Sequence, residues 1–190
     1  MIRFWCVPAL MAIVLGAVEP AQAQGSQDDD RRALIQTLRL VKIQRVSLMR
    51  TAVEKREAPL AACLDRLATD ERLEADLMPL IARSLPTPES ARPTLAFLAT
   101  PGGSKLAAAV ERREPEFKPA LRRPVFLPGA VPMSADELTA DEVRAIDGFL
   151  RSDQGAPLVA ILKDTSGFAQ LIRTLELRKT LAAECGIGGK

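Results

Sequence analysis

The chain has 190 residues, of which 47% are hydrophobic, and a formal net charge of +2 at pH 7. This length and composition allow one domain with a buried core and exclude an intrinsically disordered chain. The small net charge argues against a general nucleic-acid-binding protein. Because the sequence contains no His, Ser-His-Asp catalysis, Cys-His catalysis and the commonest zinc ligand are excluded as well.

The N-terminus has the three parts of a secretory signal. Residues 1–3 are a short cationic start, residues 4–18 form an apolar run, and Ala21 and Ala23 place small side chains where a signal peptidase reads them. The apolar run is shorter than the roughly 20 residues that cross a bilayer, so a retained anchor is the weaker alternative. We predict cleavage after Ala23, export to the periplasm, and a single mature domain, residues 24–190, without a stable transmembrane segment.

Two cysteines, Cys63 and Cys185, remain in the predicted mature chain, because Cys6 lies in the signal. An oxidising compartment favours one intramolecular disulfide between them. Two buried free thiols are the alternative. Neither cysteine belongs to a Cys-x-x-Cys motif, so the sequence does not indicate a redox catalyst.

The first half of the predicted domain has the pattern of consecutive helices. Residues 31–57 contain no Pro or Gly, and their apolar residues fall on two different faces, which predicts two helices with a bend near residues 39–43. The three acids at 28–30 suit a helix start. A calcium site is the weaker interpretation, since no Gly and distant Glu follow at the required spacing. Farther on, Pro79 should kink or shorten a helix that Thr69 caps.

Two stretches of the second half, residues 87–110 and 139–162, match each other without gaps at an offset of 52, with seven identities in 24 positions. Each predicts a helix, a break at a hydroxyl residue that caps the next helix, and a second helix packed back on the first. A glycine in the first turn of the second helix would allow close approach near a Phe. The residues of this predicted helix–break–helix repeat are Thr87, Phe97, Thr100 and Gly103 in one copy and Thr139, Phe149, Ser152 and Gly155 in the other.

Residues 113–134 join the two copies and contain five prolines, which predicts an extended, largely non-helical connector. Its basic start could dock on an anionic envelope surface, but the interleaved glutamates favour a solvated connector. A last helix should run from about Thr165 to Cys185. We expect Phe168, Leu171, Ile172 and Leu175 on its buried face because they share one side of a helical wheel.

No group of residues marks a catalytic, cofactor or metal site. The segment 102–105, Gly-Gly-Ser-Lys, lacks the first Gly and the preceding strand of a phosphate loop. The carboxylates Asp141 and Glu142 stand at a predicted helix start, where they are expected to cap the helix. We therefore predict no cofactor and no metal. A hydrolase that uses carboxylates or a Ser-Lys pair is the alternative function.

The Phe-x-x-Ser/Thr-x-x-Gly pattern, preceded by a Thr-capped acidic helix, resembles the bacterial family described as domain of unknown function 2059. Its signature, Phe-Tyr-x-Ser-x-x-Gly, is matched by Phe149, Ser152 and Gly155 and more weakly at 97, 100 and 103, with Leu98 and Leu150 in place of the Tyr. The resemblance covers about residues 70–165. It implies an exported all-helical protein and carries over no catalytic residue.

These observations predict an all-α helical bundle with an internal repeat, closed by a disulfide. The function that we expect is a non-enzymatic envelope protein that binds an as yet unknown protein or envelope component through a helical groove. A purely structural module, with its own second copy as partner, is a third interpretation.

Overall fold

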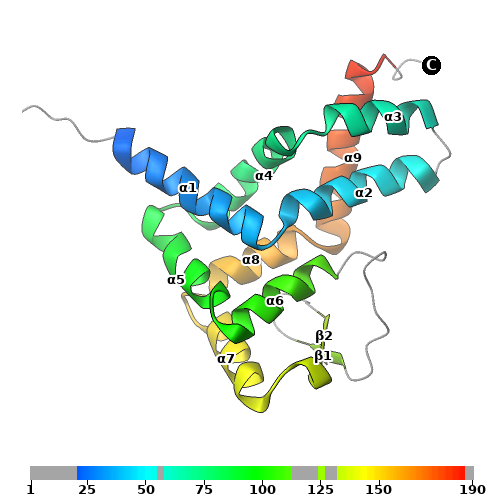
Figure 1. Ribbon diagram of the computed structural model, residues 1–190. Helices are drawn as coiled ribbons and strands as arrows, with labels where there is room; N and C mark the ends of the chain where they lie inside the picture. Colours follow the sequence, from blue (N-terminus) through cyan, green and yellow to red (C-terminus); the bar gives the residue numbers. More distant parts are fainter. Residues whose placement is uncertain (1–20, 55–57, 113–123, 127–131, 187–190) are drawn as a thin grey trace, which may run out of the picture.

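The computed structural model of the protein describes residues 21–54, 58–112, 124–126 and 132–186. Over these residues the chain forms nine α-helices and one short pair of strands, which confirms the predicted all-α class (Figure 1). The helices are α1 (Ala21–Thr37), α2 (Leu40–Glu54), α3 (Ala58–Leu67), α4 (Asp70–Ser84), α5 (Pro88–Leu98), α6 (Pro101–Glu111), α7 (Ala140–Arg151), α8 (Ala156–Asp164) and α9 (Gly167–Glu184). The strands, β1 (Pro124–Phe126) and β2 (Pro132–Ser134), pair antiparallel, and a 3-10 turn, Ala135–Glu137, follows them.

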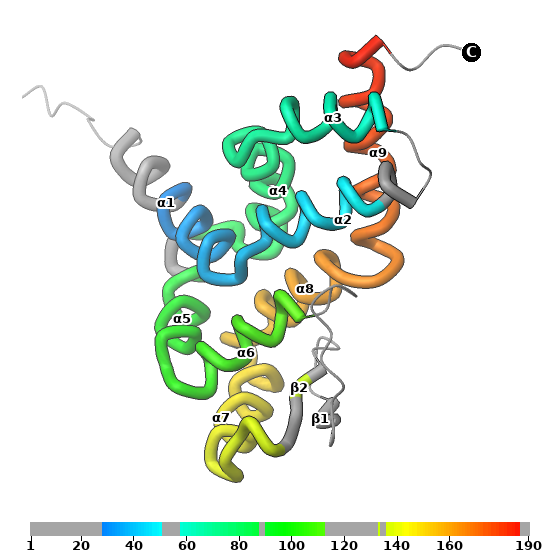
Figure 2. Tube along the Cα trace, turned by 45° about the vertical axis from the view of Figure 1, so that its right-hand side comes forward, coloured from blue at the N-terminus to red at the C-terminus, as the bar shows by residue number. Residues whose placement is uncertain are grey.

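The helices are arranged along the length of the molecule (Figures 1 and 2). The helix α3 and the C-terminal part of α9 lie at one end, α7 and the strands lie at the other, and α2, α4 and α8 lie between them. The strand β2 lies within the predicted connector, and its Met133 is fully buried in the main core. The other parts of the connector, residues 113–123 and 127–131, lie outside the described residues.

Two apolar clusters make the core. The larger one is built by α1, α2, α4, α5, α6, α7, α8 and Met133. The smaller one joins α2, α3, α4 and α9 through Leu48, Leu60, Leu64, Ala68, Leu73, Leu177 and Leu181. The predicted disulfide is present beside the smaller cluster, where Cys63 on α3 is bonded to Cys185 at the end of α9 with their Cα atoms 6.2 Å apart.

The bend predicted near residues 39–43 is present, and it lies at residues 38–39, between α1 and α2. The helix α1 ends at Thr37, and Arg39 takes the left-handed backbone conformation, with φ of 54°. A side chain is unfavourable in this conformation, and Arg39 donates a hydrogen bond to the Glu111 carboxylate of α6 at 2.7 Å. The acids at 28–30 do not start a helix, because α1 begins at Ala21.

Pro79 lies inside α4 and does not end the helix, although we expected it to kink or shorten this helix. The helix α4 continues through Pro79 to Ser84 and is not shortened there. Proline removes one backbone donor and crowds the preceding turn. The apolar contacts of Leu77, Leu80 and Ile81 on the core side of the same segment offset this cost.

The prediction for the buried face of α9 was wrong. Phe168 is 76% exposed, and Leu171 and Ile172 are each 43% exposed. The buried side of the first half of α9 carries Gln170 and Thr174 instead. Gln170 can be buried because the Ser47 hydroxyl of α2 accepts its hydrogen bond.

The predicted signal lies outside the described residues, except that residues 21–23 form the start of α1. In the described part of the chain, none of the helices combines the length and the hydropathy of a membrane span.

Candidate functional site

The hydroxyl residues of the two predicted breaks make the same hydrogen bonds. The Thr100 hydroxyl donates to the Phe97 carbonyl at 2.7 Å and accepts from the Gly103 N–H at 3.1 Å. The Ser152 hydroxyl donates to the Phe149 carbonyl at 2.7 Å and accepts from the Gly155 N–H at 3.2 Å. Each hydroxyl therefore joins the last turn of one helix to the first turn of the next segment.

The two glycines lie against the backbone of the preceding helix. A Cβ atom added to Gly103 would stand 2.0 Å from the Phe97 carbonyl oxygen, and one added to Gly155 would stand 1.9 Å from the Phe149 carbonyl oxygen. No side chain can occupy such a space. The expected close approach at these glycines is present, and it involves the Phe backbone in both places.

The Phe side chains meet each other. The rings of Phe97 and Phe149 are stacked, with their centroids 4.0 Å apart and their planes 7° from parallel. Sequence reasoning placed both rings near the ends of their helices but did not foresee this contact. The structure therefore brings the centres of the two predicted copies together.

Two details of the motif differ from expectation. Thr87 is the N-cap residue of α5, but its side chain makes no capping hydrogen bond. Gly155 is the N-cap residue of α8 and so precedes its first turn, and Ser152, which was predicted to cap α8, is instead the C-cap residue of α7. By contrast, Thr139 and Glu142 form the predicted capping box at the start of α7.

The groups that could have formed a hydrolytic centre are held in structural contacts. The Lys105 ammonium lies 2.7 Å from Glu142, the carboxylate that completes the capping box. These bonds to Lys105 and to the Thr139 backbone lower the pKa of Glu142. Asp141 is paired with Arg144 on the same helix. None of these contacts activates a nucleophile.

A polar layer of buried and half-buried side chains joins α2, α4 and α9 and was missed by sequence reasoning. Gln44 on α2 donates to the Asp76 carboxylate of α4 at 3.2 Å and accepts from Arg173 of α9 at 3.1 Å. Arg173 also donates to the Asp164 carbonyl at 2.9 Å. Burial raises the pKa of Asp76, and the charge of Arg173 opposes this increase. The polar residues at helical spacing on α2 and α9 were the available signal, but they read equally well as solvent-exposed faces.

A trough made of two shallow basins runs along α4. Its first basin has a volume of about 640 Å³ and a floor of Ala75, Met78, Pro79 and Ala82, with Arg32, Asp70, Glu71 and Glu74 around it. Its second basin has a volume of about 450 Å³ and lies between α4 and the α1–α2 bend. The residues around the second basin are Ile35, Gln36, Arg39, Val41, Lys42, Arg45, Asp70 and Glu74. The two basins share Asp70 and Glu74, so they lie next to each other along α4.

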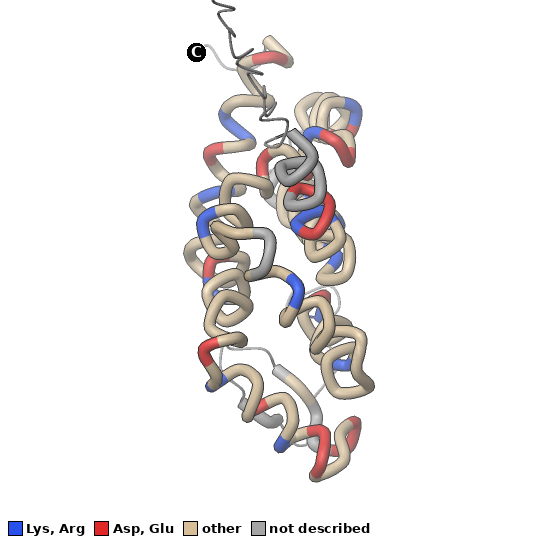
Figure 3. The backbone as a smooth tube through the Cα atoms, turned by 90° about the vertical axis from the view of Figure 1, so that its left-hand side faces the viewer, with Lys and Arg blue, Asp and Glu red and all other residues tan. Residues whose placement is uncertain are grey.

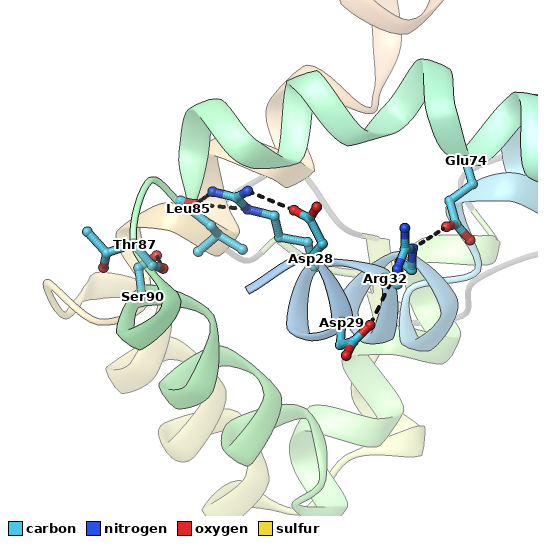
Figure 4. Close-up of polar contacts among 8 residues, drawn as sticks. Asp28, Asp29, Arg32, Glu74, Leu85, Thr87 and Ser90 are labelled. Atoms are coloured by element: carbon cyan, nitrogen blue, oxygen red, sulfur yellow. Dashed lines mark hydrogen bonds and ion pairs between the residues drawn. The ribbon is translucent and has the colours of Figure 1, made fainter. Parts of the chain in front are cut away.

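Ion pairs and hydrogen bonds hold the walls of the trough. Arg32 on α1 bridges Asp29 and Glu74, with 3.0 Å to the Glu74 carboxylate (Figure 4). Arg31 donates to the Leu85 carbonyl after α4 at 2.7 Å, and this contact fixes the other end of the crossing between α1 and α4. Arg45 closes the second basin by pairing with Asp70 at 2.7 Å. The shape of the trough is therefore preorganised.

Two features give the first basin a modest negative charge. It carries three carboxylates and one guanidinium, but Glu74 is paired with Arg32 and Asp70 with Arg45, so the charge offered to a partner is mainly that of Glu71. In addition, Pro79 has no N–H to donate to the Ala75 carbonyl one turn earlier, and both residues line the floor. Elsewhere on the surface positive and negative residues are interspersed along the helices (Figure 3).

Three comparisons with known proteins give no relative. No family model, curated protein or solved structure matches the chain. A search of the described residues for three or more His, Cys, Asp or Glu side chains placed to hold a metal ion finds no such group.

Proposed function

We propose that the protein is an exported, non-enzymatic binding protein that holds a segment of a partner protein in the trough along α4. The observation that supports this proposal is the combination of an apolar floor with the exposed Glu71 carboxylate at the edge of a wide depression, whose walls are joined by ion pairs. Such a surface suits a partner segment, whereas catalysis requires convergent groups in an enclosed pocket.

The chemistry of the first basin indicates the kind of segment. Glu71 is exposed, and hydrogen bonds from its own backbone N–H and from Thr69 lower its pKa. It therefore presents a carboxylate at the rim at neutral pH. A segment with one or two small apolar side chains and a Lys or Arg would cover the floor and pair with this rim. The alternative of a hydrolase is weaker, since Lys105, Asp141 and Glu142 serve the fold.

Export and the repeat belong to the same proposal. The signal pattern of residues 1–23 and the disulfide support a periplasmic location. The matching hydroxyl and glycine contacts of α5–α6 and α7–α8 support an internal repeat joined by the connector. In our proposal the internal repeat has a structural role and does not bind the partner. We also propose, from the motif at Phe149, Ser152 and Gly155, that the protein is related to the domain of unknown function 2059.

Site-specific photo-crosslinking in the periplasm of the source cell tests the binding function. A photoreactive amino acid in place of Ala75, which is exposed on the floor of the first basin, should give an adduct of defined mass. The matched control carries the same group at Ala96, an exposed position on α5. Glu71→Lys should reduce the Ala75 adduct at least fivefold, with only a small decrease in melting temperature from the loss of a carboxylate in the first turn of α4.

Two results would overturn the proposal. One is the absence of any adduct that is specific to Ala75. The other is an adduct of equal yield at Ala96, since that would reflect general proximity and not binding in the trough.

A further inference from the structure

In the first half of α9 the apolar side faces outward and the polar side faces the protein interior. Its outward side presents Phe168, Leu171 and Ile172, of which Phe168 is 76% exposed, and continues to the half-buried Leu175. Its inward side carries Gln170, which is 6% exposed. An exposed apolar face opposite a buried polar one is unusual for a surface helix and indicates that something covers the outward side.

The rotation of α9 is fixed by specific bonds. Gln170 donates to the Ser47 hydroxyl of α2 at 2.7 Å, and both side chains are buried. Arg173 is held by the Gln44 carbonyl oxygen and by the Asp164 backbone. Turning α9 to bury Phe168 would leave these polar groups without partners, which is costly in a protein interior. The apolar face is therefore a stable feature of the folded chain.

We propose that this face binds the same face of a second copy, as an antiparallel pair of α9 helices about a two-fold axis. The four residues 168, 171, 172 and 175 have the spacing with which one helix anchors on another. In an antiparallel pair, placing Phe168 opposite Leu175 of the second copy also places Leu171 opposite Ile172. Each apolar residue then has an apolar partner, as an isologous contact requires.

Charge complementarity favours the same register. It brings Glu176 of the second copy over Gly167, the first residue of α9. Glu176 is paired with Lys179 of its own helix at 3.1 Å, an exposed contact that leaves its second carboxylate oxygen for the partner. The N-cap residue, Ser166, makes no side-chain hydrogen bond to this helix end, and the space around Gly167 is open. A carboxylate is favourable at the N-terminus of a helix. The two ends of the apolar face would therefore each receive a carboxylate.

The chemistry around the face favours a second copy over a lipid surface. Between residues 165 and 175 the only charged residue is Arg173, whose side chain is 17% exposed and directed to the polar layer. Two copies can therefore meet without repulsion. Two helical turns cover less than the roughly 800 Å² per partner of a standard interface, so the dimer is weak and depends on concentration. The face shares no residue with the α4 trough.

Sedimentation velocity on the protein purified from the periplasm tests this inference. The sequence from Gln24 onward has no Trp or Tyr, so interference optics are the suitable detection. The wild type should shift from monomer toward dimer between low micromolar and near-millimolar concentrations. Phe168→Asp and Ile172→Asp should each weaken the association at least tenfold, whereas Ala96→Asp, which adds the same charge at another exposed helical position, should leave it unchanged.

Charge reversal tests the register. Glu176→Lys should weaken the association several-fold at low salt, and high salt should reduce this difference. Circular dichroism melting should be the same for all four variants, because each substituted side chain is exposed. A wild type that stays monomeric throughout would overturn the inference. So would an association that Phe168→Asp leaves intact, or a monomer that binds anionic vesicles through Phe168.

Discussion

The rings of Phe97 and Phe149 lie parallel, with their centroids 4.0 Å apart, although the residues are far apart in the sequence. The carbonyl groups of both residues accept the hydrogen bonds of Thr100 and Ser152. The same two carbonyl oxygens face the glycines. The ring contact therefore joins the break between α5 and α6 to the break between α7 and α8.

The ring stack should give a measurable coupling energy. Phe97→Leu, Phe149→Leu and the double variant form a double-mutant cycle, which separates the contact from the loss of apolar burial. We expect a coupling of about 0.5–1.5 kcal/mol, the usual contribution of a paired aromatic contact. Urea unfolding followed by circular dichroism gives the four free energies. Simple additivity of the two single substitutions would contradict a stabilising stack.

The two glycines at the breaks should not tolerate alanine. Gly103→Ala and Gly155→Ala place a Cβ atom 2.0 Å and 1.9 Å from a backbone oxygen, and the required shift of the helices should cost about 1–3 kcal/mol or more. Gly148→Ala on α7 is the matched control, because nothing lies within 4 Å of its added Cβ. Alanine is the better helix former, so Gly148→Ala should be neutral or stabilising in urea unfolding. Equal losses at all three positions would refute the steric explanation.

Asp76 should make the free energy of unfolding depend on pH. Burial raises its pKa above the ordinary value of 3.8, so the folded protein keeps this proton at a pH where the unfolded chain has lost it. Unfolding in that range releases a proton, and the contribution of Asp76 to stability is therefore lost as the pH rises from about 3.8 through the folded pKa.

Subtraction of the Asp76→Asn variant isolates this effect. Asparagine keeps the shape of the side chain and cannot titrate. The difference in free energy of unfolding, wild type minus variant, should fall as the pH is raised through this window. A difference that stays constant, or that grows with pH, would show that Arg173 outweighs burial at this carboxyl group.

The disulfide should contribute a large part of the stability. It links residues separated by 122 positions, and the chain-entropy model gives up to about 5 kcal/mol for a loop of that length. Cys63→Ser with Cys185→Ser should lower the melting temperature and loosen α3 and the end of α9, which hydrogen exchange would detect. Dithiothreitol should lower the melting temperature of the wild type toward that of the double variant. It should leave the double variant unchanged, and an equal response of both proteins would exclude the disulfide as its target.

Local chemistry by itself determined much of this fold. The absence of Pro and Gly from residues 31–57, the hydroxyl caps and the apolar spacing were sufficient to predict helices. The capping box at Thr139 and the close approach at Gly103 and Gly155 follow from interactions within a few residues. The pairing of Cys63 with Cys185 followed from the cysteine count in the predicted mature chain. The helix, cap and glycine predictions held because each depends on neighbours in the sequence, whereas the disulfide prediction held because the predicted mature chain offers one possible pair of cysteines.

Contacts between distant helices were decided only by the tertiary structure. The spacing of Phe168, Leu171 and Ile172 marked one face of α9 as apolar, and burial of that face was the natural expectation. The fold buries the opposite face, because Ser47 and Gln44 of α2 provide hydrogen-bond partners for Gln170 and Arg173. A helical pattern shows which residues share a side, but the partners that neighbouring helices supply determine which side can be buried. The trough along α4 depends in the same way on where α1 and α2 cross it, which no local pattern specifies.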